Sequence, residues 1–407
     1  MQGPAKIVRS GEIPDYEYLE PLFEWKDGNA YLTVDRIRYG RKQGAIFTYH
    51  NPPVHQLGNP ALAAYLAGFD ALDPLEEDLW FVIFHSGCDP VHAGGDLKES
   101  LAQLRESNAE RERLGAAGAS AEEMSALFGW GDARIDKGFA LYKKFRKWGD
   151  KMRTVATCGG GTRFGGSAEV VLMADEIVAD SRSAMCFSES QIGLIPGWGG
   201  VGRAITKAGV DNARAMAATA RVVNATDLEI IGIFNEVLTT GAPLPKKQRT
   251  GDPEADQARY AEALQRNHDE MGRALLIAAL DKGVDSAGAT FMEPFRRKTL
   301  MDPAEVTVEV ARRSSPYTYS GLWGKPLKEA AATIAELGKP LAPQSIEKLE
   351  SLLAGVNMRQ WDGAAEETFI RAEGRADGEL YRDPRFAKGI EATLEQTVAD
   401  FREVANS

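Results

Sequence analysis

Two glutamates and two pairs of glycines provide the groups that acid–base chemistry on a carbonyl compound requires. The pairs Gly94-Gly95 and Gly165-Gly166 each stand where a predicted strand passes into a predicted helix. The first N–H groups of a helix are unpaired and carry partial positive charge, and glycine lets a ligand approach them closely. Two such amides on one carbonyl oxygen would form an oxyanion hole for a developing enolate or tetrahedral intermediate. Tight turns alone would also explain these glycines.

The two glutamates favour the chemical interpretation, because both lie in apolar segments. Glu169 follows Gly166 by three residues and so falls in the first turn of the predicted helix, where a helix-dipole partner is the simpler explanation. However, residues 170–173 are all apolar, which predicts a buried helix, and a buried carboxylate is unfavourable unless it is paired. Glu189 lies in a similar segment. Two carboxylates in different environments beside one substrate can act as acid and base.

The elements that must position these groups alternate between strand and helix. The runs "GAIFTYH", "LWFVIFHSG" and "RTVATC" predict strands, and "NPALAAYLAGFDAL", "GGDLKESLAQLRES" and "SAEVVLMADEI" predict helices. The shorter runs "EIVADS" and "MCF" predict further strands. This alternation predicts an α/β fold with mainly parallel strands.

The chain divides into three predicted parts. Residues 1–43 form an N-terminal arm with a strand pair around Asp27-Gly28, and residues 44–240 form the α/β core. A polar, Ala-, Glu- and Arg-rich stretch at 100–150 predicts a helical insertion of two or three helices, with a joint near 115–120. Residues 241–407 begin with a Pro-, Gly- and charge-rich linker and then form a helical C-terminal region.

Composition excludes several classes of protein. With 43% hydrophobic residues the chain can bury a large core, and a net charge of −11 without a basic face argues against a nucleic-acid partner. The basic residues of 143–147 alternate with aromatic ones and predict the solvated face of a helix. Cys88, Cys158 and Cys186 are too far apart for a metal site and indicate reduced thiols. Without a membrane span or signal peptide, we expect a cytoplasmic protein.

Longer motifs resemble one known family. "HAGGDLKE" followed by "TCGGGTRFGGSAEVVLMADEIVADSRSAMCFSESQIGLIPGWGG" is similar to the crotonase, or enoyl-CoA hydratase/isomerase, superfamily. The resemblance covers about 46–240, interrupted by the insertion, and more weakly 325–400. It implies a crotonase-like ββα spiral core, a homotrimer or dimer of trimers, and an acyl-CoA substrate with no separate cofactor or metal.

Position by position, the resemblance implies that Gly95 and Gly166 supply the oxyanion-hole amides, and that Glu169 and Glu189 position and activate water. The chain departs from the family at Arg163 and Trp198, which either shape an acyl pocket for a cyclic or carboxylated chain or cover a surface or subunit contact. The residues expected at the substrate or CoA are His55, Ala93, Gly94, Asp96, Leu97, Gly165 and Trp198.

These expectations favour an enzyme that adds water to an α,β-unsaturated acyl-CoA thioester. Three alternatives stay open: a hydrolase that opens the ring of a cyclic β-oxoacyl-CoA by C–C cleavage, an acyl-CoA isomerase, and a non-catalytic acyl-CoA-binding or assembly subunit. The stretch Gly197–Gly202 also fits a GxGxxG nucleotide motif, but only a short apolar run precedes it and the crotonase register explains its glycines better. His92, beside the proposed oxyanion loop, is expected to be a packed histidine.

Overall fold

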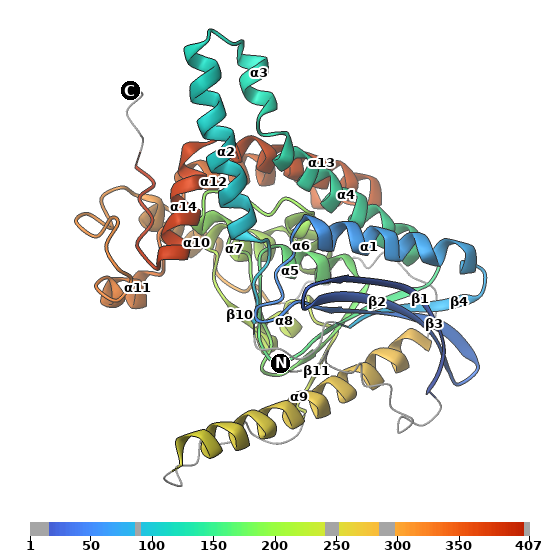
Figure 1. Ribbon diagram of the computed structural model, residues 1–407. Helices are drawn as coiled ribbons and strands as arrows, with labels where there is room; N and C mark the ends of the chain where they lie inside the picture. The colour runs from blue at the N-terminus through green and yellow to red at the C-terminus, as the bar shows by residue number, and fades with distance from the viewer. Residues whose placement is uncertain (1–15, 86–90, 241–251, 285–297, 403–407) are drawn as a thin grey trace.

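The computed structural model describes residues 16–85, 91–240, 252–284 and 298–402. Its framework is a seven-stranded sheet in the order β1-β2-β3-β4-β6-β8-β11, beside a four-stranded sheet in the order β10-β9-β7-β5 (Figure 1). The strands of the large sheet are β1 Tyr16–Asp27, β2 Ala30–Tyr39, β3 Lys42–His50, β4 Leu79–His85, β6 Arg153–Cys158, β8 Glu176–Asp180 and β11 Glu236–Leu238. Those of the small sheet are β5 Val91–His92, β7 Thr162–Phe164, β9 Ala184–Cys186 and β10 Val223–Asn224.

The chain winds as a spiral, because it adds a strand to each sheet and then a helix in successive turns. β4 is followed by β5 and then by α2, and β6 is followed by β7 and then by α5. Pairing is parallel from β3 to β11 in the large sheet and from β5 to β9 in the small one. The predicted α/β class and ββα spiral are therefore confirmed. The core helices are α1 Asn59–Leu72, α5 Gly166–Met173, α6 Gly200–Ala208, α7 Val210–Thr219 and α8 Ala225–Ile230, with short 3₁₀ turns η1 Asp73–Leu75 and η2 Glu189–Gln191.

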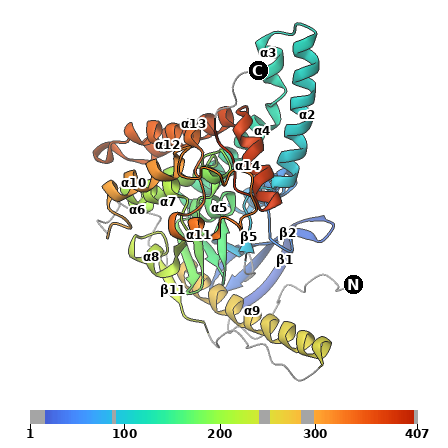
Figure 2. The same cartoon turned by 90° about the vertical axis from the view of Figure 1, so that its left-hand side faces the viewer.

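Strand β4 shows why the large sheet is buried on both faces. Phe81 and Ile83 pack in one hydrophobic cluster, whereas Val82 and Phe84 pack in another. Side chains of a strand alternate between faces, so an uninterrupted apolar run requires cover on both sides. Helix α9, Pro253–Val284, packs with the first cluster, and the remaining core helices pack with the second. Figures 1 and 2 show α9 on one side of the sheet and α12 to α14 on the other.

The N-terminal strands join the same sheet. β1 and β2 pair in antiparallel fashion, with Gly28 at φ 58° in the turn between them, so the strand pair predicted around Asp27-Gly28 is confirmed. β2 then pairs with β3. The division of the chain at residues 43 and 240 stays a prediction, and residues 241–251 of the predicted linker lie outside the described ranges.

The stretch between 97 and 149 is helical, as predicted. It comprises α2 Leu97–Ala116, α3 Ala121–Ala126 and α4 Gly129–Gly149, and residues 117–120 form the break between α2 and α3. The outer part of α2, with α3, projects from the body in both views (Figures 1 and 2). α4 returns to the body and buries the aromatic side chains of Tyr142, Phe145 and Trp148. Its lysines form ion pairs at the surface, for example Lys143 with Glu367 at 2.5 Å, which fits the predicted solvated face.

A buried ion pair holds the C-terminal helix α13 against this core. The guanidinium of Arg203 on α6 donates to Glu366 on α13 at 3.1 Å, and the hydroxyl of Tyr142 on α4 donates to the same carboxylate at 2.9 Å. Removing one partner of such a pair would leave a buried charge uncompensated. α13 therefore has a fixed position relative to α4 and α6. The C-terminal helices are α10 Pro303–Ser314, α11 Ala331–Leu337, α12 Pro343–Ala354, α13 Gly363–Leu380 and α14 Pro384–Glu395, with the 3₁₀ turn η3 Met358–Gln360.

The structure also bears on the cysteines and on the question of membrane-spanning helices. Cys158 and Cys186 are buried, and Cys88 lies outside the described residues. None of the helices in the described part of the chain has both the length and the apolar character needed to span a membrane.

Candidate active site

The two glycine pairs lie next to each other, although 70 residues separate them in the chain. Gly94 and Gly165 have φ of 58° and 51°, a region that favours glycine. A Cβ atom on Gly94 would lie 2.5 Å from the carbonyl oxygen of Phe164 and 3.2 Å from the amide nitrogen of Gly166. The side chain of Ser167 accepts a hydrogen bond from the Gly94 N–H at 3.0 Å. The strand exits of β5 and β7 are thus held together.

One cavity of about 330 Å³ contains most of the predicted site. It is enclosed by the two glycine loops, by η2 and the loop that follows it, and by parts of α4, α13 and α14. The predicted residues that line it are Ala93, Gly94, Gly95, Leu97, Gly165, Gly166, Glu169, Glu189 and Trp198. The structure therefore brings both proposed amides and both proposed acids to the same space.

Glu169 is buried in the first turn of α5, with 3% of its surface exposed. Its Oε2 accepts hydrogen bonds from the N–H groups of Trp198 at 2.8 Å and Gly200 at 2.9 Å, at the start of α6. A Cβ atom on Gly200 would lie 2.7 Å from Cγ of Glu169, so the close contact requires glycine there. Burial raises the pKa of Glu169 to about 7, against the lowering effect of the amide hydrogen bonds. This carboxyl can therefore gain or lose a proton near neutral pH.

Glu189 begins η2 and is also buried, but it is less well paired. Its Oε1 lies close to Gly165, where a Cβ atom would be 2.9 Å away, and its Oε2 has no hydrogen-bond partner among the described residues. Burial, followed by the charge of Glu169, raises the pKa of Glu189 well above its ordinary value. Two N–H donors stabilise the ionised form of Glu169, whereas Oε2 of Glu189 has none among the described residues, so Glu189 is the carboxyl expected to keep its proton when Glu169 has lost its own.

Two predicted CoA contacts lie outside this cavity. His55 is buried and its Nδ1 accepts a hydrogen bond from the N–H of Asn51 at 3.0 Å. Asp96 caps α2 and accepts a hydrogen bond from Gln56 at 2.5 Å. Neither residue lines the cavity, so their role in CoA binding stays a prediction.

The two unusual residues of the motif have different positions. Trp198 lines the cavity, and its ring packs closely on two glycines. A Cβ atom would lie 2.2 Å from the ring if it were added to Gly138, and 2.4 Å from it if it were added to Gly166. Through Gly138 the inserted helix α4 supports this wall. Arg163 is buried elsewhere: its Nε donates to Sγ of Cys158 at 3.1 Å, and it lines a much smaller separate cavity with His92. His92 is itself buried, as expected for a packed histidine.

The glycines of 197–202 serve the fold of the site rather than a phosphate. Helix α6 begins at Gly200, and η2, not a strand, precedes it. The N–H groups at this end of α6 are bound by two carboxylates: Glu169 accepts from Gly200, and Glu373 of α13 accepts from Val201 at 3.1 Å and Gly202 at 3.0 Å. These amides are therefore occupied by carboxylates and are not available to a phosphate.

Sequence reasoning missed the polar groups that α4 and α13 bring to the cavity, Arg134 and Asp377. The sequence of α13 does contain a pattern that indicates buried acids. Glu366, Glu373 and Asp377 are seven and four residues apart, so they lie on one face of the helix together with apolar residues. Among the described residues, no group of three or more His, Cys, Asp or Glu side chains could hold a metal ion.

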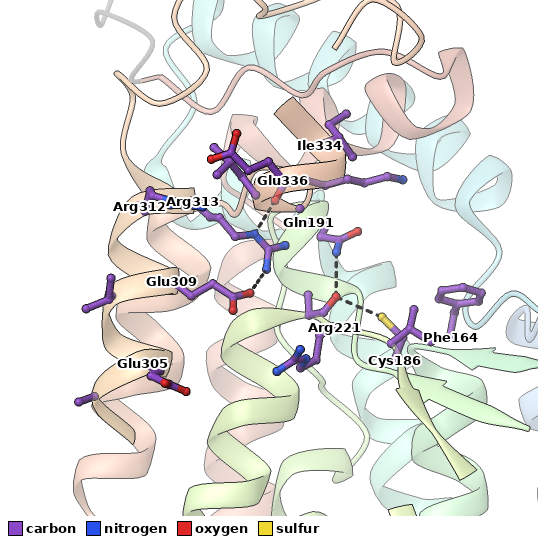
Figure 3. A pocket seen from close by; sticks show the side chains of 17 residues that line it. Phe164, Cys186, Gln191, Arg221, Glu305, Glu309, Arg312, Arg313, Ile334 and Glu336 are labelled. Atoms are coloured by element: carbon purple, nitrogen blue, oxygen red, sulfur yellow. Dashed lines mark hydrogen bonds and ion pairs between the residues drawn. The ribbon is translucent and has the colours of Figure 1, made fainter. Parts of the chain in front are cut away.

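A larger groove of about 890 Å³ adjoins the cavity (Figure 3). Phe164, Gln191 and Lys339 line both spaces. Figure 3 shows Arg313 in the groove wall, paired with Glu309 of α10 at 2.7 Å. The cavity therefore has an adjoining open space on the side of α10 and α11.

Known proteins resemble this chain in sequence and in fold. The family model described as enoyl-CoA hydratase/isomerase matches residues 67–250. Residues 67–250 thus carry a segment of the enoyl-CoA hydratase/isomerase family, as the motifs indicate. A carnitinyl-CoA dehydratase structure from Mycobacterium thermoresistibile has 15% sequence identity and a TM-score of 0.53, over 89% of this chain and 91% of that one. An enoyl-CoA hydratase from Rhodobacter sphaeroides 2.4.1 has 17% identity and a TM-score of 0.49, over 89% of each chain.

The matched residues contain both glycine pairs and both glutamates of the crotonase motifs. The resemblance seen in the sequence over about 46–240 is thereby confirmed for its larger part. The weaker resemblance over 325–400 lies outside the matched residues and stays a prediction. At these identities the structural likeness concerns the fold alone.

Proposed function

We propose that this crotonase-superfamily protein adds water to the double bond of an α,β-unsaturated acyl-CoA thioester. The observation that carries the proposal is that Gly95, Gly166, Glu169 and Glu189 line one small cavity. CoA is part of the substrate, and no separate cofactor takes part. A homotrimer or dimer of trimers, and a cytoplasmic location, remain part of the proposal.

In the proposed reaction the N–H groups of Gly95 and Gly166 donate to the thioester oxygen. This interaction makes the β-carbon electrophilic and stabilises the enolate that forms. Ionised Glu169 takes a proton from water as the water oxygen bonds to the β-carbon. Protonated Glu189 donates its proton to the α-carbon, which collapses the enolate to a 3-hydroxyacyl thioester. One water is added in total, and a proton returns from Glu169 to Glu189 before the next cycle.

A ring-opening C–C hydrolase is the second candidate, and the polar groups Arg134 and Asp377 in the cavity favour it. In that reaction water attacks a ring ketone next to the α-carbon. The C–C bond then breaks to give a carboxylate and an enolate, which Glu189 would protonate. A subunit that only binds acyl-CoA is less well supported. Oε2 of Glu189 has no hydrogen-bond partner among the described residues, and burial raises the pKa of both glutamates. Such groups destabilise the folded protein and are typical of sites where they take part in a reaction.

Product analysis in ¹⁸O-labelled water tests the proposal directly. Purified protein would be given crotonyl-CoA, cyclohex-1-ene-1-carbonyl-CoA and 2-oxocyclohexanecarbonyl-CoA, with mass spectrometry of the products. Water addition places ¹⁸O in a β-hydroxyl group, whereas ring opening places it in a new carboxylate. Binding of all esters without any labelled product would contradict both enzymatic candidates.

The pH dependence of kcat/KM follows from the two pKa values. Glu169 must be ionised, so the rate is expected to rise as pH increases through about 7. Glu189 must be protonated, so the rate is expected to fall at higher pH as Glu189 ionises. Because the two carboxyls are coupled, the two apparent pKa values of this profile belong to the pair rather than to either residue alone. A profile measured from pH 5 to pH 10 that stays flat through neutrality would contradict these roles.

A further inference from the structure

The wall of the cavity formed by α4 and α13 carries polar groups that the proposed hydration does not use. Arg134 comes from α4, and Asp377 and Tyr381 come from the C-terminal end of α13 and just beyond it. Both Asp377 and Arg134 influence the pKa of Tyr381, after the larger effect of burial, so the three side chains lie together. None of them belongs to the motifs shared with the superfamily.

Asp377 reaches the cavity because the backbone opposite it has no side chain. A Cβ atom on Gly197 would lie 2.3 Å from Oδ2 of Asp377. Its Oδ1 accepts a hydrogen bond from the N–H of Ile195 at 3.1 Å, which fixes the carboxyl. Burial raises the pKa of Asp377 well above its ordinary value, against the hydrogen bond from Ile195 and with help from the charge of Glu169. This carboxyl therefore keeps its proton to higher pH than an ordinary aspartate, and in the protonated form it can donate a hydrogen bond.

Arg134 supplies a second donor. It is 2% exposed, and its two terminal nitrogens donate to the hydroxyl of Ser100 at 2.5 Å and to Glu99 at 2.8 Å. Its Nε is buried and has no hydrogen-bond partner among the described residues. A buried donor without a partner destabilises a folded protein, and a ligand oxygen that accepts from it removes this cost.

The balance of charges decides which oxygen fits. Three acids, Glu169, Glu189 and Asp377, line the cavity. The charge of Arg134 is already compensated by its ion pair with Glu99. Glu169 is ionised when it acts as the base, so a substrate carboxylate would meet this charge without a free cation from Arg134 to balance it. An uncharged acceptor, a ketone or a hydroxyl, can take hydrogen bonds without this repulsion.

We propose that Arg134 and Asp377 form a subsite for an uncharged oxygen on the acyl group, so that the enzyme selects ketone- or hydroxyl-bearing acyl thioesters over hydrocarbon ones. The subsite rests on the proposed function, because it requires an acyl thioester in this cavity. It is built by the inserted helix α4 and the C-terminal helix α13. The spiral core alone contributes neither side chain.

Binding of saturated CoA esters tests this subsite without depending on water addition. Dissociation constants would be measured by calorimetry for cyclohexanecarbonyl-CoA and for its 3-oxo and 4-oxo derivatives. With the wild-type protein, at least one ketone is expected to bind about tenfold more tightly than the parent ester, as one net hydrogen bond would give. Equal binding of all three esters, or tighter binding of the parent ester, would overturn the subsite.

Variants assign the effect to the two residues. Asp377→Leu and Arg134→Lys are expected to abolish the preference for the ketone while leaving the affinity for the parent ester unchanged; the lysine can still pair with Glu99. Asp377→Asn is expected to keep the preference, because its amide both accepts from Ile195 and donates to the ketone. If Asp377→Leu does not fold, Asp377→Asn and Arg134→Lys still test whether these two residues cause the preference for the ketone.

Glu373→Gln is the matched control, since Glu373 lies on the same helix but does not line the cavity. It is expected to leave the preference intact. Parallel losses for the ketone and parent esters in the Asp377 and Arg134 variants would show a purely structural role. This failure differs from that of the proposed function, which would appear as absence of labelled product in ¹⁸O water while ketone selectivity persists.

Discussion

Replacing Glu169 by glutamine is expected to lower kcat for water addition by about 10²- to 10⁴-fold. Glutamine has the same shape, and its carbonyl oxygen can still accept the N–H groups of Trp198 and Gly200 that Glu169 binds. The loop before α6 therefore keeps its position. What the variant loses is a group that takes a proton from water at neutral pH.

The structure offers a close control for this variant. Glu373 is buried like Glu169 and also binds two N–H groups at the start of α6, those of Val201 and Gly202. It does not line the cavity. Glutamine at position 373 can accept from only one of these two N–H groups, so Glu373→Gln loosens the start of α6 without removing an acid from the cavity, and kcat is expected to fall far less than in Glu169→Gln. Equal losses in both variants, measured by steady-state kinetics at equal folded fraction, would mean that Glu169 acts only by holding α6.

Glu189→Gln is expected to abolish proton transfer to the α-carbon, with a loss of about 10²- to 10⁴-fold. Oε2 of Glu189 has no hydrogen-bond partner among the described residues, so replacing that atom breaks no hydrogen bond within the described part of the chain. The separate role of this acid can be seen in a reaction without water addition. In D₂O, the wild-type protein should exchange the α-hydrogens of butyryl-CoA, which mass spectrometry detects.

The exchange experiment separates the two glutamates. We expect Glu169→Gln to retain α-hydrogen exchange, because the thioester amides and Glu189 are intact. Glu189→Gln should lose it. The opposite result, with exchange lost only in the Glu169 variant, would reverse the acid and base that the pKa values indicate.

The local elements were predictable because short-range patterns specify them. The helix predicted at residues 59–72 is α1, and the strand predicted in "GAIFTYH" is the greater part of β3. The apolar periodicity of such segments is a property of neighbouring residues, so it can be detected without knowing the partners. The same holds for the break near residue 117, where α2 ends.

Arg163 is a residue whose position follows from the alternation of side chains along strand β7. The sequence predicts that it shapes an acyl pocket with Trp198 or covers a surface or subunit contact, but the structure buries it beside a separate small cavity. Phe164, the next residue of β7, lines the cavity. Successive side chains of a strand point to opposite faces, so these two neighbours could not both face the substrate.

The sequence by itself determined the class of fold, the crotonase motifs and the identity of the two glutamates, because these depend on residue types at fixed spacing within residues 93–200. Only the tertiary structure decided which groups surround the cavity that contains these glutamates. Asp377 lies more than 200 residues after Glu169 in the chain, and it reaches the same space because the Arg203–Glu366 ion pair and the glycines beside α6 let α13 pack closely. Such packing depends on the shapes of surfaces that are distant in the chain, and periodicity within one segment carries no record of it.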